Sequence, residues 1–321
     1  MKKLLAVLLA LLAIGGFAFA APAVGLSLDG TVTLVDQNFQ GSQSWDDSYI
    51  NFSAADPNGM YGIYFALGND KANASTTADD YLYINGWKAY GYFFNKMLKV
   101  QTGNQRSTGY YTASAYLGSS NGTYTLGNAA GDCVLFEVAP MTGLTIAAQL
   151  PYTTTAQDMA DIFAGSAVGV AYTIDKVGVA KVYANLTNWK PYFGYGFSFT
   201  GVENLSAVLY GKVDLTGTDA AVTADLSATY TVAEFTPEFE FKSTIAPDFA
   251  GTAYVGVNWA KDALSANIDT SFSVAPDFAW GGITADAYYA FDNNFKLGVN
   301  VGYSEADGFT FSVPLTYDFA F

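Results

Sequence analysis

Histidine is missing from this chain of 321 residues, and cysteine occurs only once, as Cys133. The absence of histidine excludes Ser-His catalytic triads, histidine-based general acid-base catalysis and the common zinc sites that contain histidine. A single cysteine cannot form a disulfide within the chain. We therefore expect a protein that is not an enzyme, has no cofactor and has no dedicated metal site.

Charge is also scarce, and positive charge is the scarcest. The chain has 14 Lys and Arg residues against 29 Asp and Glu residues, a formal net charge of -15, and charged residues make up only 13% of it. An acidic surface repels phosphate backbones, so nucleic acid is excluded as a natural partner. So few charges are unusual in a soluble protein. Together with 16% aromatic residues, they suit short strands joined by tight turns.

Long apolar runs are equally rare. Nothing in the chain approaches the roughly 18 uninterrupted apolar residues of a transmembrane helix, which excludes a helical membrane protein. One shorter apolar run, Leu4 to Ile14, follows two lysines and precedes Ala18-Phe19-Ala20. This order is typical of a secretory signal peptide. We predict that residues 1–20 are the signal peptide, with cleavage after Ala20 or, as the alternative, after Ala23.

What the chain does contain is alternation with a period of two. From Phe309 to Phe321 every odd position is large and apolar, while the even positions are small or polar. This period predicts a strand with one apolar face. The same alternation, with turn residues between the segments, recurs in at least five other places: 26–34, 61–67, 193–199, 222–230 and 264–272.

Such segments number about twenty, with sixteen or eighteen as alternatives because the stretch from Tyr81 to Gly131 has a blurred pattern. Residues 21–321 show no linker, so we predict one all-β domain, a closed antiparallel transmembrane β-barrel with an even number of strands, about 16 to 20. The three longest connections are predicted at 36–47, 69–80 and 151–166, as the first, third and ninth, on the side opposite the termini. Pro237 and Pro314 fall inside predicted strands, where we expect bulges or rim positions.

The polar faces of the strands would line a water-filled interior. By parity the following charged residues are candidates for this lining: Asp29, Lys99, Glu137, Lys181, Lys212, Asp214, Asp225, Glu238, Glu240, Lys242, Asp269, Asp286, Lys296 and Asp318. Acids outnumber lysines, which predicts a negative interior that prefers cations. The alternative is that the acids serve only to solvate the interior and the outer loops.

The closing strand that ends on Phe321 and the hairpin 138–144 resemble those of general bacterial outer-membrane porins, and the resemblance of pattern covers about residues 26–321. It implies an outer-membrane channel through which small hydrophilic solutes and ions diffuse, surrounded by lipid and assembled as a homotrimer. In that family the assembly machinery reads the C-terminal aromatic residues, here Tyr317, Phe319 and Phe321. A loop narrows the channel, and 151–165, with Asp158 and Asp161, is the candidate; an outer lid is the alternative. The family commonly sets arginines against such a loop, but only Arg106 lies in the relevant half of this chain.

Other readings remain open. A substrate-selective, sugar-type channel would use inward tyrosines as a stacking track: Tyr183, Tyr192, Tyr210, Tyr254 and Tyr288. A structural or adhesive surface barrel is a further alternative, which short loops disfavour. Asp248 and Asp277 occur in a repeated Ala-Pro-Asp-Phe-Ala motif and could bind calcium, although Pro-Asp is ordinary turn chemistry. The pair Glu238 and Glu240 is similar to a glycosidase carboxylate pair, but nearby Lys242 favours a charged stripe.

Overall fold

The structure is a computed structural model, and the account below concerns the residues that it describes. These are 23–68, 83–103, 133–151, 159–164, 166–186, 191–291 and 294–320. The predicted signal peptide, Asp158 and Phe321 lie outside them.

The described part of the chain is built almost entirely from strands. It forms eighteen strands and one short helix, α2. Their bounds are β1 Ala23–Asp36, β2 Ser42–Ala55, β3 Tyr61–Gly68, β4 Tyr83–Phe93, β5 Leu98–Gly103, β6 Cys133–Met141, β7 Leu144–Pro151, α2 Met159–Ala164, β8 Ala167–Ile174, β9 Gly178–Asn185, β10 Tyr192–Phe199, β11 Leu205–Asp214, β12 Ala221–Tyr230, β13 Phe235–Ala246, β14 Ala250–Lys261, β15 Leu264–Ala275, β16 Ala279–Ala290, β17 Phe295–Ser304 and β18 Gly308–Ala320.

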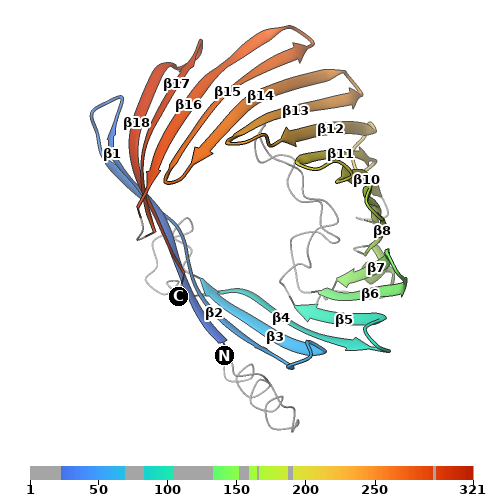
Figure 1. The fold of residues 1–321 in the computed structure, drawn as a ribbon. Helices are drawn as coiled ribbons and strands as arrows, with labels where there is room; N and C mark the ends of the chain where they lie inside the picture. Colours follow the sequence, from blue (N-terminus) through green and yellow to red (C-terminus); the bar gives the residue numbers. More distant parts are fainter. Residues whose placement is uncertain are drawn as a thin grey trace.

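All these strands belong to one antiparallel sheet. Each strand from β2 to β17 pairs with the strands before and after it in the sequence, and β1 pairs with both β2 and β18. Figure 1 shows the sheet curving round, so that the blue first strand lies beside the red last strand. The prediction of an all-β antiparallel domain is confirmed. The described strands number within the predicted range.

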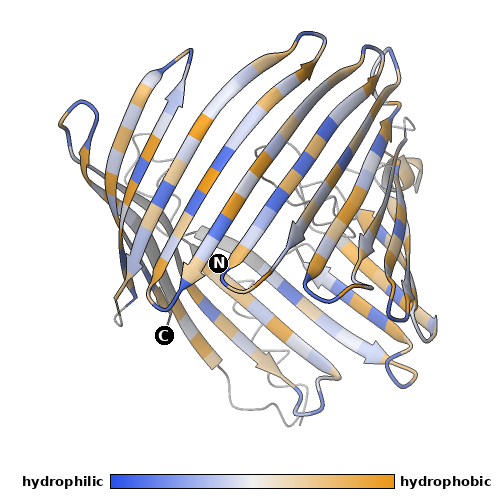
Figure 2. Cartoon of the chain, turned by 45° about the horizontal axis from the view of Figure 1, so that its top comes forward, coloured by the Kyte–Doolittle hydropathy of each residue, from blue (hydrophilic) through white to orange (hydrophobic). Residues whose placement is uncertain are grey.

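The two faces of the sheet differ because side chains alternate along each strand. In β12, Leu226 is 42% exposed on the outer face, while its neighbours Asp225 and Ser227 are 2% exposed on the inner face. Figure 2 shows the same alternation of hydrophobic and hydrophilic residues along many strands. Among the described residues, no helix has the length and apolar character needed to cross a membrane.

The two prolines within strands meet the prediction in different ways, one at a bulge and one near a strand end. The register of β1 against β18 shifts between Thr33 and Val35, at the pair that includes Pro314. Because proline has no backbone N–H to donate, the neighbouring strand accommodates it with a bulge. Pro237 lies near the start of β13, beyond the β12 pairing, which ends at Glu238. This is a rim position, so both expectations are confirmed.

The predicted long connection at 36–47 is wrong. β2 already begins at Ser42, and only 37–41 connect it to β1. The Asp36 carboxylate accepts hydrogen bonds from the backbone N–H groups of Asn38 and Gln40, at 2.9 and 3.0 Å, which stabilises a tight turn. Residues 42–47 are mostly polar and therefore looked like loop, although they pair with β1.

The other two predicted loops have different outcomes. Residues 69–80 lie between β3 and β4 but outside the described residues. Residues 152–166 connect β7 to β8 and include α2, so this connection exists, but it is the seventh rather than the ninth. The connection with the widest span in the numbering, 104–132 between β5 and β6, was not predicted and also lies outside the described residues.

Candidate functional site

The strands direct most of the predicted charged residues to the inner face. On β13, for example, Glu238 and Glu240 are buried, whereas Phe239, which lies between them in the sequence, is exposed on the outer face. Alternation along the strand therefore places both carboxylates inward. The same parity holds for Lys99, Glu137, Lys181, Lys212, Asp214, Asp225, Lys242, Asp269, Asp286, Lys296 and Asp318. Asp29 shares this face by register, because its backbone lies opposite Asp318 on one side and Asp47 on the other.

Two of the lysines are neutralised locally. The Lys99 ammonium lies 2.8 Å from a Glu137 carboxylate oxygen across β5 and β6. Lys212 lies 2.6 Å from Asp214, two residues along β11, and its ammonium also sits 4.9 Å from the centre of the Tyr192 ring. Each pair is partly exposed, so we assign it a modest contribution to stability. Each of these pairs offsets the charge of its own lysine.

The acidic side chains of β12 and β13 are more deeply buried than those of the two ion pairs. The Tyr210 hydroxyl donates a hydrogen bond of 2.6 Å to Asp225, and both side chains are buried. Glu240 is fully buried as well. Lys242 is the register partner of Asp225, so the one lysine on these two strands lies within the acidic group. Asp225, Glu240 and Lys242 thus belong to one group of charged side chains on the inner face of β12 and β13.

Charge is segregated around the inner face. Five of the inner acids lie on strands β12 to β16, namely Asp225, Glu238, Glu240, Asp269 and Asp286, while Asp29, Glu137, Asp214 and Asp318 lie on β1, β6, β11 and β18. Four lysines, Lys88, Lys99, Lys181 and Lys212, lie on β4 to β11. In Figure 1 the orange strands β13 to β16 and the cyan strands β4 and β5 lie on opposite sides of the interior. One side of the interior is therefore acidic and the other is basic to neutral.

Sequence reasoning missed Lys88. It lies on the inner face of β4, with its ammonium 5.5 Å from the centre of the Tyr64 ring. β4 falls in the stretch where small residues blur the alternation, with Ala89 and Gly91 at outer positions. The register partners of Ala89 and Gly91 are Ile63 and Tyr61 of β3, and only this pairing reveals the parity of β4.

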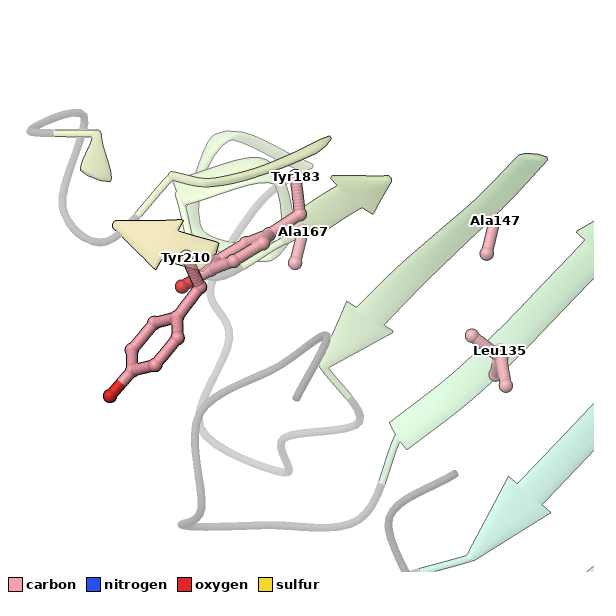
Figure 3. Packing of buried hydrophobic residues seen from close by; sticks show 5 residues of the cluster. All are labelled: Leu135, Ala147, Ala167, Tyr183 and Tyr210. Carbon is pink, nitrogen blue, oxygen red and sulfur yellow. The ribbon is translucent and has the colours of Figure 1, made fainter. Parts of the chain in front are cut away.

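The tyrosines predicted as a stacking track are mostly embedded in the wall. Tyr183, Tyr210 and Tyr254 are only 3%, 1% and 7% exposed. Figure 3 shows Tyr183 and Tyr210 near Ala167, within a buried cluster that also contains Leu135 and Ala147. The Tyr183 ring lies over Gly194 of the next strand, where the absence of a side chain leaves room for it. Buried ring faces cannot stack on a passing sugar, which weighs against this track.

The remaining candidates are distributed as follows. α2 contains Asp161 and contacts β7, but the Asp161 side chain lies outside the described ones. Tyr317 and Phe319 lie on the outer face of β18, with ring centres 6.2 and 5.4 Å from that of Phe295. Asp248 and Asp277 lie on separate connections, after β13 and after β15. Within the described part of the chain, no group of three acidic, Cys or His side chains could hold a metal ion.

Comparison with known proteins identifies the architecture. No family model and no curated protein matches the sequence. A triple mutant of the Rhodopseudomonas blastica porin is 13% identical, with a TM-score of 0.55 over 93% of this chain and 100% of that chain. Another variant of the same porin is 13% identical with a TM-score of 0.53, over the same shares. A structure described as "Asymmetric conductivity of engineered proteins" is 14% identical, with a TM-score of 0.53 over 94% of this chain and 100% of that one. The chain therefore has a porin-like fold.

Proposed function

We propose that this protein is an outer-membrane porin. Residues 1–20 direct export and are cleaved, and residues 21–321 form one closed transmembrane β-barrel. Water fills its interior, and small hydrophilic solutes and ions diffuse through it. Pairing of β1 with both β2 and β18 supports closure, because the first and last strands are then hydrogen-bonded neighbours.

The observation that carries this proposal is the contrast between the two faces of the same wall. The outer face exposes large apolar side chains along many strands, including Phe193, Ile268 and Val299 at 44%, 51% and 49%. Soluble proteins rarely expose contiguous apolar surface of this extent, whereas lipid covers such a surface at no cost. The inner face bears ion pairs and carboxylates, which need water or polar partners.

We further propose that the channel prefers cations. The pore-lining set is the group of inward charged residues described above, and the acids of β12 to β16 outweigh the single lysine among them. The two ion pairs on the other side offset part of its positive charge. A negative potential in the interior raises the local concentration of cations and lowers that of anions.

The partners follow from the same proposal. Lipid contacts the outer face, the barrel-assembly machinery reads the C-terminal strand through Tyr317, Phe319 and Phe321, and a homotrimer is the expected assembly. Asp158 and Asp161 remain candidates for a loop that narrows the channel. A sugar-selective channel is the weaker alternative, because three of its five tyrosines are buried. A structural or adhesive barrel is a further alternative: the connections 247–249, 276–278 and 305–307 are short, but those at 69–82, 104–132 and 152–166 are longer.

Reconstitution in a planar lipid bilayer tests the function. The refolded protein should produce stepwise conductance in KCl, because a water-filled interior conducts ions. In a KCl gradient, the reversal potential should have the sign of K⁺ selectivity. A refolded, membrane-inserted protein that gives no conductance steps would refute the porin proposal. A reversal potential with the sign of Cl⁻ selectivity would refute the cation preference alone.

A further inference from the structure

A cavity of about 490 Å³ opens on the inner face of strands β13 to β16. Its lining includes three carboxylates, Glu238, Asp269 and Asp286, together with the amide side chain of Asn267 and the phenol ring of Tyr288. It lies close to the turn at 262–263, toward the end of the sheet at which β1 begins and β18 ends. Among the described residues that line it, none is basic.

Hydrogen bonds between neighbouring strands engage several polar side chains around this cavity. The Asn267 side-chain N–H donates to Asn258 at 2.8 Å, and the Asn258 N–H donates in turn to Glu238. The Thr284 hydroxyl donates to Asp269 at 2.6 Å, and the Tyr288 hydroxyl donates to Asn300 at 2.8 Å. The cavity keeps neutral donors, such as the Ser265 hydroxyl and the second N–H of each amide, but the three carboxylates supply its only charged groups among the described lining residues.

Asp286 is the clearest case. It stands between Asn267 and Asn300 in register, and the hydrogen bonds of these two amides run to other residues: Asn267 donates to Asn258, and Asn300 accepts from Tyr288. Within the described part of the chain, neither a hydrogen bond nor an ion pair reaches the Asp286 carboxylate. The Asp269 carboxylate on the neighbouring strand repels it. A ligand that complements this position must therefore supply both positive charge and N–H donors.

We propose that this cavity is a binding subsite for small organic ammonium ions that pass through the channel. The Asp286 carboxylate accepts hydrogen bonds from the ammonium group, Asp269 and Glu238 add negative potential, and Tyr288 borders the organic part of the ligand. The inference rests on the proposed channel function and names a class of solute that the channel would retain in transit.

Two other occupants fit less well. A bare divalent metal ion needs several oxygen ligands converging at about 2.0 to 2.6 Å, and no described group of three acidic side chains meets that need. A neutral polyol would bring hydroxyl donors but no charge to offset the carboxylates. The cavity volume also exceeds what a single hydrated inorganic ion requires. An organic ammonium ion offsets the charge of the carboxylates, supplies hydrogen-bond donors to them and has a size that fits the cavity.

Channel block by a matched pair of solutes tests the proposal. Glucosamine and glucose share one ring, but only glucosamine has an amine, which is protonated at about pH 6, where exposed carboxylates are ionised. Single channels in KCl are titrated with each solute, and the half-blocking concentration is measured for the unmodified protein, Asp286→Asn and Asp318→Asn. Asp318 is an inner-face acid on β18 outside the cavity, so its variant reports the general effect of removing one inner charge.

We expect glucosamine to block at lower concentration than glucose. Asp286→Asn should raise the half-blocking concentration of glucosamine about three- to fivefold, the size of one partly exposed ion pair. Asp318→Asn should change it by less than about twofold. Conductance steps with equal block by the two solutes, or with equal shifts in both variants, would overturn the subsite and leave the channel intact. If no steps occur, the proposed function fails and the subsite falls with it.

Discussion

The hydrogen bond between Tyr210 and Asp225 offers a quantitative test of the inner wall. The hydroxyl donates to the carboxylate over 2.6 Å between β11 and β12, and the two side chains are 1% and 2% exposed. Tyr210→Phe keeps the ring and removes only the donor. Since water cannot easily replace a donor at a buried carboxylate, the substitution should lower the free energy of unfolding by about 1.5–3 kcal/mol.

The measurement is urea unfolding of protein reconstituted in lipid vesicles, followed by tryptophan fluorescence. Tyr230→Phe is the matched control, because Tyr230 ends the neighbouring strand and is 45% exposed. It should change stability by less than about 0.5 kcal/mol. If the two variants lose the same free energy within that margin, the buried hydrogen bond does not stabilise the wall and the reasoning is refuted.

Two further outcomes follow from the same structure. The double substitution Glu238→Gln and Asp269→Asn should lower the K⁺ to Cl⁻ permeability ratio about two- to threefold in 0.1 M salt. The reason is that a unit charge about 10 Å from a passing ion contributes ~0.4 kcal/mol before screening. An unchanged reversal potential would contradict the negative interior. Gly178→Ala should lower the free energy of unfolding by about 1–3 kcal/mol, because Gly178 has a φ of 155° and a Cβ there would meet the Ser198 carbonyl oxygen. The control Gly217→Ala, with no contact closer than 3.4 Å, should be neutral in the same urea titration.

Much of the outer face could be predicted because apolar residues alternate with small or polar residues along the sequence of each strand. Every second position is aromatic in β10 and large and apolar in β18, so the period alone assigns both strand and face. The same reasoning failed at the start of β2, where Ser42 to Asp47 are mostly polar and only pairing with β1 reveals a strand. Such a segment is a strand because its backbone is hydrogen-bonded to a neighbouring strand, and its own residue pattern does not show this.

The inner face was predictable residue by residue but not as a whole. Parity placed Tyr183 and Asp286 inward, yet the burial of Tyr183 depends on Gly194 in the next strand. The hydrogen bonds that bypass Asp286 likewise depend on strands β14, β15 and β17. The segregation of charge depends on the order of strands around the sheet and on Lys88, which lay in the blurred segment. These features depend on contacts between neighbouring strands, which a single sequence does not show.

The central claim is that one face of each strand meets lipid while the other meets water. Two adjacent residues of β15 test it most directly: Ile268, 51% exposed on the outer face, and Asp269 on the inner face. Each is replaced by cysteine in a Cys133→Ser background and reconstituted in vesicles. Asp269→Cys should react with a charged thiol reagent and escape a quencher attached to lipid chains, whereas a probe at Ile268→Cys should be quenched by lipid and shielded from the charged reagent. Equal reactivity and equal quenching at the two positions would contradict the account.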